Sequence, residues 1–456
     1  MAALERDFPD QVQAQPELIA YHATNAEQLE AAVGYWCKAG ERGLARAAMK
    51  EANAVYSRAL DIVRRLPPSD RRERTELEIL LELGRTQQAI RGSVSDECGR
   101  TFGRARQLAE RSGRAEHLVE ALKGLMYFHH GRTELNRAAE VAGARLEISK
   151  RLGLNPEIVA AYDDLATVSF SNGDFQNALD LSSSASSIIE AADRYSWSRE
   201  IEDAHRSILI LWAQTMTVLG FHEQALAACD RAMSMARAAS HDYTLVTTLG
   251  NVCFVDQVGG RDESLAERAE EMVKVSTRRG FPTWLARGLI FGGWRRAVHL
   301  HEGAGLSDMR DGLARLHTIG AKVWRPYYLG LLAHACGAVG QPRAGLEAVA
   351  EAMAMAEPDG EQDQLAELHR IRGALHSVCG DRSAAEACFQ QALAVARRQK
   401  ARLWELRAAE CLARLWADAG QRTRALDLLS PVYGWFTEGL DGPDLRRSRD
   451  LLHALG

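Results

Sequence analysis

The sequence contains a set of glycines that recur at a nearly constant interval, and this repeat restricts the fold more than any other feature. Successive glycines lie about 40 residues apart. One step is twice as long, which indicates a weaker repeat hidden between two clear ones. Glycine tolerates the left-handed conformation that ends a helix, so each position predicts a turn between two helices. The glycines are Gly173, Gly220, Gly260, Gly340, Gly380 and Gly420.

A second pattern accompanies each of these glycines. The residue five positions after the glycine is small in all but one case. It is paired with the residue that lies twelve positions before it in the chain. Two helices cross closely only where both side chains at the contact are small, so the pattern predicts helical hairpins. The predicted contact pairs are Ala166 with Ala178, Ala213 with Ala225, Cys253 with Leu265, Ala333 with Gly345, Gly373 with Ala385, and Ala413 with Ala425.

Composition agrees with a helical repeat. The chain of 456 residues is rich in Ala, Leu, Arg and Glu and has only 11 prolines and 10 tyrosines, which favours helices over strands. Its 46% of hydrophobic residues is enough for a continuous core, and stacked repeats need no domain boundary. We therefore expect an all-α, right-handed superhelical solenoid of about ten helical hairpins.

We expect four segments along this solenoid. The first, 1–24, is an N-terminal arm that Pro9 and Pro16 make either irregular or a short helix. Divergent helical hairpins follow at 25–155, and regular repeats of about 40 residues follow at 156–437. A C-terminal capping helix with a polar outer face lies at 438–456.

Three local features carry further expectations. Gly40 predicts the turn between the first two helices of the divergent segment. The pair Gly292–Gly293 follows no strand and predicts close packing of helices rather than a phosphate-binding loop. The breaks at 192–197 and 357–362 have ordinary loop lengths.

Charge and cysteine usage exclude several classes of protein. The net charge is −5 with both signs mixed along the chain, whereas nucleic-acid binding requires a basic stripe. None of the eight cysteines forms a C-x-x-C pair, which favours reduced thiols. The uncharged stretches 207–222 and 326–342 are shorter than the ~20 apolar residues of a bilayer span and are better explained as buried helices. We expect a cytoplasmic protein that binds neither nucleic acid nor membrane.

The sequence offers no recognisable catalytic motif. It lacks G-x-x-x-x-G-K-[ST], so the phosphate loop and its lysine are missing. Neighbouring histidines are adjacent or two residues apart, not at the i, i+4 spacing of a helical zinc site. Paired acids within the predicted helices have no companion base or nucleophile. We therefore predict no catalytic residue, metal ligand or cofactor, and expect that the protein is not an enzyme.

Several stretches resemble known repeat proteins. Gly373, Ala385, Phe389 and Ala392 match the pattern of the tetratricopeptide repeat (TPR), stretched here from the usual 34 residues to about 40, so the segment 156–437 is expected to be TPR-like. Three stretches near the C-terminus resemble the last repeat of one bacterial family; they lie at 403–409, 412–416 and 431–439. Four other stretches resemble earlier parts of the same region, and these lie at 324–328, 340–342, 15–20 and 32–36.

That family comprises large signalling proteins that join a class III adenylate/guanylate cyclase domain, or a DNA-binding domain, to an AAA-type ATPase followed by TPR-like repeats. The resemblance implies that this chain corresponds to the repeat region. The catalytic and ATPase elements precede that region in the family and have no counterpart in this sequence. The resemblance thus implies a sensor or scaffold portion without the catalytic machinery.

The resemblance also implies where a partner binds. In TPR arrays the first helix of each hairpin lines an inner groove, whose side chains contact a peptide or partner protein. Transferring that register to this sequence gives candidate groove residues: Asp164, Gln214, Tyr327, His334, Arg370 and Arg414. Polar and aromatic side chains on a curved wall suit recognition of an extended chain or a helix. The alternative, that these are solvated groove residues without a ligand, is equally compatible with the sequence.

Together these features predict a non-enzymatic protein-interaction module in bacterial signal transduction, with a protein or peptide in its concave groove. By resemblance, the partner is a cyclase or ATPase subunit, or another copy of such a protein. One alternative is the regulatory portion of a class III adenylate cyclase or AAA-type ATPase whose catalytic part is missing or encoded separately. The other is the ligand-sensing part of a transcription regulator.

Overall fold

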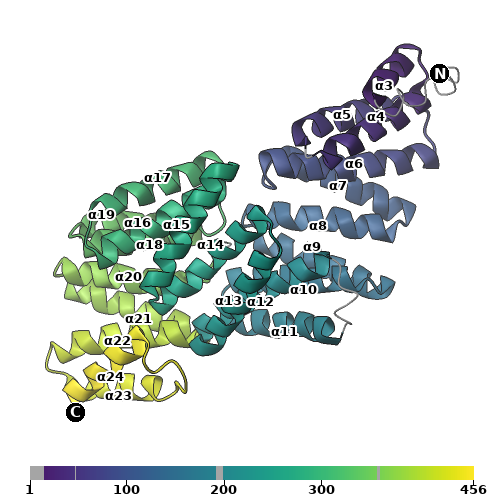
Figure 1. Ribbon diagram of the computed structural model, residues 1–456. Helices are drawn as coiled ribbons and strands as arrows, with labels where there is room; N and C mark the ends of the chain where they lie inside the picture. Colours follow the sequence, from purple (N-terminus) through teal and green to yellow (C-terminus); the bar gives the residue numbers. More distant parts are fainter. Residues whose placement is uncertain (1–14, 47, 192–198, 357–359) are drawn as a thin grey trace. The chain divides into compact units, whose positions relative to one another are not determined.

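The computed structural model describes residues 15–46, 48–191, 199–356 and 360–456. Within these ranges all regular structure is helical, and successive helices pack against each other as hairpins (Figure 1). The expected all-α fold of stacked helical hairpins is therefore confirmed. The chain divides into two compact units, Met1–Glu157 and Ile158–Gly456, which are described separately.

Unit 1 is a succession of helices in which each packs against the next along the chain. The long helix α6 begins with a cap, because the side chain of Ser69 accepts the backbone N–H of Arg72. The helices are α3 (Pro16–Asn25), α4 (Leu29–Ala45), α5 (Met49–Val63), α6 (Asp70–Arg91), α7 (Asp96–Ser112), α8 (Ala115–Gly131) and α9 (Leu135–Leu152).

Two expectations for this unit need comment. Gly40 does not form a turn: α4 continues to Ala45, and a Cβ at Gly40 would lie 2.5 Å from Cζ of Tyr56 in α5. The glycine is needed there because an aromatic ring packs directly against the backbone. Residues 16–25 form a short helix rather than an irregular arm. Residues 1–14 of the expected arm, and the expected loop positions 192–197 and 357–359, lie outside the described residues.

Unit 2 contains the regular repeats as seven hairpins and a final helix. The first hairpin begins within the last residues of unit 1. The helices are α10 (Asn155–Ser171), α11 (Phe175–Ala191), α12 (Arg199–Leu219), α13 (His222–Ala238), α14 (Asp242–Gly259), α15 (Asp262–Arg279), α16 (Pro282–His299), α17 (Ala304–Thr318), α18 (Arg325–Ala338), α19 (Pro342–Ala356), α20 (Leu365–Val378), α21 (Arg382–Arg398), α22 (Arg402–Ala417), α23 (Arg422–Tyr433) and α24 (Pro443–Leu455).

The turn glycines have the backbone conformation that the sequence predicts. All six of the recurring glycines have φ between +69° and +96°. The weaker repeat inside the doubled step is the hairpin of α16 and α17, where His301 takes the left-handed conformation with φ of +55°. Histidine tolerates this conformation better than most residues, so the turn is kept although the glycine is absent.

The close contacts inside the hairpins also follow the predicted register. A Cβ at Gly345 would lie 2.8 Å from the carbonyl oxygen of Ala333, and one at Gly373 would lie 3.1 Å from that of Ala385. The hidden repeat has the same feature, since a Cβ at Gly293 would lie 2.5 Å from the carbonyl oxygen of Gly305. Other repeat positions are fully or almost fully buried: Ala178, Ala225, Ala385, Phe389, Ala392, Ala413 and Ala425.

The repeats of unit 2 curve until the array closes on itself. From α12 to α22 each first helix contacts the first helix of the next hairpin, and α22 also contacts α12. In Figure 1 the teal helices α12 and α13 accordingly lie next to the yellow-green α22. A second contact across the closure joins the backbone N–H of Gln362 to the carbonyl oxygen of Ser171 at 2.7 Å. The first helices therefore form a ring, so the inner surface is not an open groove.

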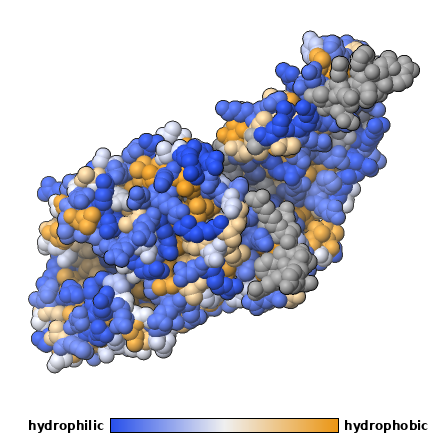
Figure 2. All heavy atoms as spheres, viewed as in Figure 1, coloured by the Kyte–Doolittle hydropathy of each residue, from blue (hydrophilic) through white to orange (hydrophobic). Residues whose placement is uncertain are grey.

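Hydrophobic residues are mostly inside the units. Figure 2 shows a face that is largely hydrophilic, with hydrophobic residues in small separate groups. The two long uncharged stretches lie mainly in α12 and α18, where residues such as Ile208 and Tyr328 are fully buried. Among helices in the described ranges, none combines the length and the hydropathy needed to cross a bilayer.

Candidate functional site

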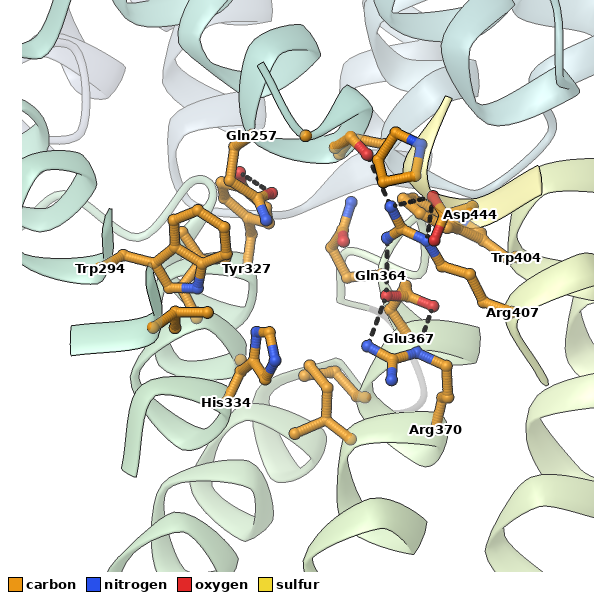
Figure 3. Close-up of a pocket in the computed structure, with 18 of the residues that line it drawn as sticks. Gln257, Trp294, Tyr327, His334, Gln364, Glu367, Arg370, Trp404, Arg407 and Asp444 are labelled. Atoms are coloured by element: carbon orange, nitrogen blue, oxygen red, sulfur yellow. Dashed lines mark hydrogen bonds and ion pairs between the residues drawn. The ribbon is translucent and has the colours of Figure 1, made fainter. Parts of the chain in front are cut away.

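Unit 2 contains a partly open cavity of about 430 Å³ on the inner side of the ring. Six helices contribute to its wall: α14, α16, α18, α20, α22 and α24. All are first helices of hairpins except α24, which follows the last hairpin. Figure 3 shows polar and aromatic side chains from these helices pointing toward a common space.

The residues that line the cavity recur with the period of the repeats. Tyr327, Glu367, Arg407 and Arg447 follow one another at intervals of one repeat length. Other lining residues are related by the same interval, as are Trp294 and His334, or Gln364, Trp404 and Asp444. Equivalent positions on successive first helices thus face the cavity, one repeat after another around the ring.

Arg407 lies at the centre of a hydrogen-bonded ion network (Figure 3). Its Nη1 donates to Oε2 of Glu367 at 3.2 Å, and its Nη2 donates to Oδ2 of Asp444 at 2.8 Å. The same Nη2 donates to the carbonyl oxygen of Val258 at 2.6 Å, and the guanidinium lies 5.1 Å from the ring centroid of Trp404. One side chain therefore links α14, α20, α22 and α24.

The two carboxylates of this network are held in their charged form. Burial alone would raise the pKa of Glu367, but the guanidiniums of Arg370 and Arg407 lower it below the usual value. Burial likewise opposes ionisation of Asp444, and Arg407 and Arg447 outweigh it and lower its pKa. Arg370 donates twice to Glu367, at 2.9 and 3.1 Å, in the bidentate arrangement that carboxylates favour.

The opposite side of the cavity is aromatic and uncharged. The hydroxyl of Tyr327 donates to Oε1 of Gln257 at 2.8 Å. Burial, together with the positive charge of Arg370, lowers the pKa of His334 to about 3, so this imidazole is neutral at physiological pH. Its ring centroid lies 6.0 Å from that of Trp294.

Two buried hydrogen-bond donors at the cavity have no acceptor among the described residues. They are the indole Nε1 atoms of Trp294 and Trp404, whose side chains are almost fully buried. The five-membered ring of Trp294 faces the space beside His334 (Figure 3). The oxygens of Glu367 and Asp444 accept from arginines and not from the indoles. A buried donor without an acceptor costs about 1–3 kcal/mol.

The candidate groove residues divide into two groups. Tyr327, His334 and Arg370 line the cavity. The other three do not: Asp164 is buried in α10, Gln214 is buried in α12 and donates to the carbonyl oxygen of Asn251, and Arg414 is exposed on α22, with its Nη2 2.6 Å from Oε1 of Glu410. The structure therefore brings half of the candidates together.

Sequence reasoning did not select the aromatic lining residues Trp294 and Trp404. It also missed Glu367, Arg407 and Asp444, which form most of the ion network of the cavity. For two of them the sequence did contain a signal, because Glu367 and Arg407 lie one and two repeat lengths after Tyr327. In the part of the chain that the structure describes, no cluster of three or more His, Cys, Asp or Glu side chains is arranged to hold a metal ion.

Comparison with known sequences gives one informative relative. No protein-family model matches the chain. "Uncharacterized protein R02095" of Rhizobium meliloti (strain 1021) is 26% identical over 375 residues, which cover 81% of this chain. The matched region is 36% of that protein, so the chain spans about a third of the length of its relative.

Comparison with solved structures places the fold. A Rap protein complexed with competence and sporulation factor matches with a TM-score of 0.58 and 10% identity, over 82% of this chain and 98% of that one. The apo form of RapI matches with a TM-score of 0.51 and 8% identity, over 81% of this chain and 98% of that one. At such low identity the likeness concerns the fold alone. The chain is thus an all-helical, TPR-like repeat protein that resembles the Rap proteins in structure.

Proposed function

We propose that this chain is a non-enzymatic regulatory module that binds a segment of a peptide or protein partner in the cavity of unit 2. The observation that carries the proposal is the convergence of charged, aromatic and apolar side chains from six helices on one space. An extended peptide presents polar backbone groups and apolar side chains together, which matches a cavity that has both polar and apolar walls.

The size and lining of the cavity support the same proposal. Its volume of about 430 Å³ falls in the range of ligand pockets, about 300–1,000 Å³. Apolar side chains such as Leu331 and Ile371 lie beside the polar groups, so that a short segment meets both surfaces. The arginine–carboxylate network fixes several side chains before binding, which reduces the entropy that a ligand has to offset.

The comparisons add context for the biological role. A protein of similar fold has been solved together with competence and sporulation factor, so this architecture is compatible with holding a second molecule. The longer Rhizobium relative favours a role as one region of a larger protein. We therefore extend the proposal to bacterial signal transduction, in which a cyclase or ATPase portion, or a transcription regulator, responds to what the module binds.

The proposal is tested by selecting random peptides from a phage library on the purified chain and measuring their affinity by calorimetry. We expect Trp294→Phe, which replaces a large aromatic side chain of the cavity wall by a smaller one, to weaken binding about tenfold. His334→Ala is expected to weaken it further, because it opens the aromatic side of the cavity.

Trp284→Phe is the matched control for that experiment. Trp284 lies on the same helix, α16, but packs against Arg287 and does not line the cavity. Its replacement should leave the affinity unchanged. Failure to select any peptide, or selected peptides that bind wild type and Trp294→Phe equally well, would contradict the proposed function.

A further inference from the structure

We propose that the carboxylate of Asp444 fills an anion-binding position in the cavity. The carboxylate of an incoming ligand displaces it and so releases α24. The inference rests on the proposed function, because it assumes that a ligand enters this cavity. It adds the chemical class of the ligand, a carboxylate, and a means by which binding changes the structure.

The anion position is defined by arginines that converge on Asp444. Its Oδ2 accepts from Nε and Nη2 of Arg407 at 3.0 and 2.8 Å, and its Oδ1 accepts from Arg447. The side chain of Asp444 is only 10% exposed. A small carboxylate in place of this side chain would meet the same donors in the same directions.

The charges that surround Asp444 favour an anion over a cation at its position. The cavity is lined by three guanidiniums and three carboxylates, those of Arg370, Arg407, Arg447, Glu367, Glu410 and Asp444. When Asp444 leaves, three guanidiniums face two carboxylates. A ligand carboxylate in its place restores the balance, whereas a cation would add to the excess.

Asp444 is also the first acidic residue of α24, and the segment before this helix closes the ring. Here Oε1 of Glu438 accepts the backbone N–H of Glu223 at 2.9 Å and that of Gln224 at 3.4 Å, at the start of α13. In return Oε1 of Glu223 accepts the backbone N–H of Gly439 at 3.0 Å. These contacts are exposed to solvent, and such contacts contribute little individually.

Side chains of the same segment pack against two turn glycines of earlier repeats. The ring of Trp435 lies 5.5 Å from that of Phe221, and a Cβ at Gly220 would lie 2.8 Å from Cε1 of Phe436. A Cβ at Gly260 would lie 2.6 Å from Cγ of Pro443, the residue before Asp444. We call residues 434–444 the closing segment. Because Asp444 joins it to Arg407, loss of that pair frees one end of the closing segment from the cavity wall.

Chemical rescue tests the anion position. Asp444→Ala should lower the melting temperature by about 5 °C or more, because Arg407 and Arg447 each lose a buried carboxylate partner. Sodium acetate should recover a large part of this loss, and sodium chloride or acetamide at equal concentration should not. Wild type and Asp450→Ala, which removes a carboxylate of the same helix that does not line the cavity, should show no acetate-specific gain. Equal effects of acetate and chloride on Asp444→Ala would overturn the proposal.

Hydrogen exchange tests the release of the closing segment. In Asp444→Asn, which keeps the shape of the side chain and removes its charge, amides at 222–225 and 434–444 should exchange about tenfold faster than in wild type, while those of α16 and α17 stay unchanged. This variant also serves if Asp444→Ala fails to fold. Unchanged exchange at both stretches would show that Asp444 does not hold the segment.

Peptides from the phage selection separate this inference from the proposed function. A peptide with a free C-terminal carboxylate should bind Asp444→Asn about tenfold more tightly than wild type, because the internal competitor is weakened. The same peptide with an amidated C-terminus and an internal Asp reports whether a side-chain carboxylate serves equally. Peptides that bind both proteins equally would overturn the inference and leave the proposed function standing. If no peptide is selected, the acetate and exchange results still decide on Asp444.

Discussion

Glycine serves two purposes in this chain, and single residues show the difference. At Gly380 and Gly420 the backbone has φ of +82° and +75°, and no neighbouring atom lies within 4 Å of the place that a Cβ would take, so conformation alone requires glycine. At Gly293 the residue lies inside a helix, and the backbone of Gly305 approaches it. There the requirement is space.

A pair of adjacent glycines provides a test at this scale. Gly293→Ala should destabilise unit 2 by about 1–3 kcal/mol, because its Cβ would lie 2.5 Å from the carbonyl oxygen of Gly305 and the helices would have to separate. Gly292→Ala, with nothing within 4 Å, should stabilise the same helix by about 0.5–1 kcal/mol. Urea unfolding of both variants measures the difference. Similar effects of the two substitutions would show that the close contact is not tight.

At the scale of elements, the connection between α19 and α20 contains an unusual pair of acids. Glu361 and Asp363 are both buried, and Oε2 of Glu361 accepts the backbone N–H of Trp324 at 2.7 Å. Burial raises the pKa of Asp363 to about 7. Burial and the neighbouring Asp363 raise the pKa of Glu361, and Arg287 of α16 opposes this shift. The connection is therefore most stable when these carboxyls hold protons.

The sign of the pH dependence follows from that shift. Between the pKa of Asp363 in the unfolded chain, about 4, and its value of about 7 in the fold, the folded state binds more protons, so this group lowers stability as pH rises through that window. Asp363→Asn should abolish this contribution. Urea unfolding at pH 5 and pH 8 should show that wild type loses more stability between these values than Asp363→Asn. An identical loss in both proteins would mean that Asp363 does not titrate in this range.

At the scale of the whole molecule, closure distinguishes unit 2 from an open repeat array. In an open array each repeat contacts only its neighbours, and stability is close to a sum of local terms. Here Arg407 donates to the carbonyl oxygen of Val258, 149 residues away. Glu438 accepts the backbone N–H of Glu223, which is 215 residues away at the start of α13. These contacts couple early and late repeats of unit 2.

Arg407 should therefore matter more than other arginines of the same helix. Arg407→Ala leaves Glu367 and Asp444 buried with fewer partners, and we expect a loss of about 3–5 kcal/mol. Arg414→Ala removes a half-exposed guanidinium from α22, and its buried partner Glu410 keeps Arg447 at 3.9 Å, so the loss should be only about 1 kcal/mol. Chemical denaturation followed by tryptophan fluorescence compares the two variants. Equal losses would argue against a central role of Arg407.

Much of the fold could be read from the sequence because its signals are local. The left-handed turns lie at the recurring glycines, and the hidden repeat appears where the step doubles. Local signals also have limits: Gly40 resembles a turn in the sequence, but a ring packs against it, and only the position of Tyr56 in the next helix reveals this. For the candidate site, the register found Tyr327, His334 and Arg370 but not the residues that pair with Arg407.

The sequence by itself determined the helices, their turns and the small residues at their crossings, because these depend on residues close together in the chain. Only the tertiary structure decided that the repeats of unit 2 close into a ring and that Glu367, Arg407 and Asp444 meet in its cavity. The physical reason is that closure depends on the sum of small rotations between successive repeats. No single repeat encodes that sum, so residues far apart in the chain become neighbours only when the whole unit has folded.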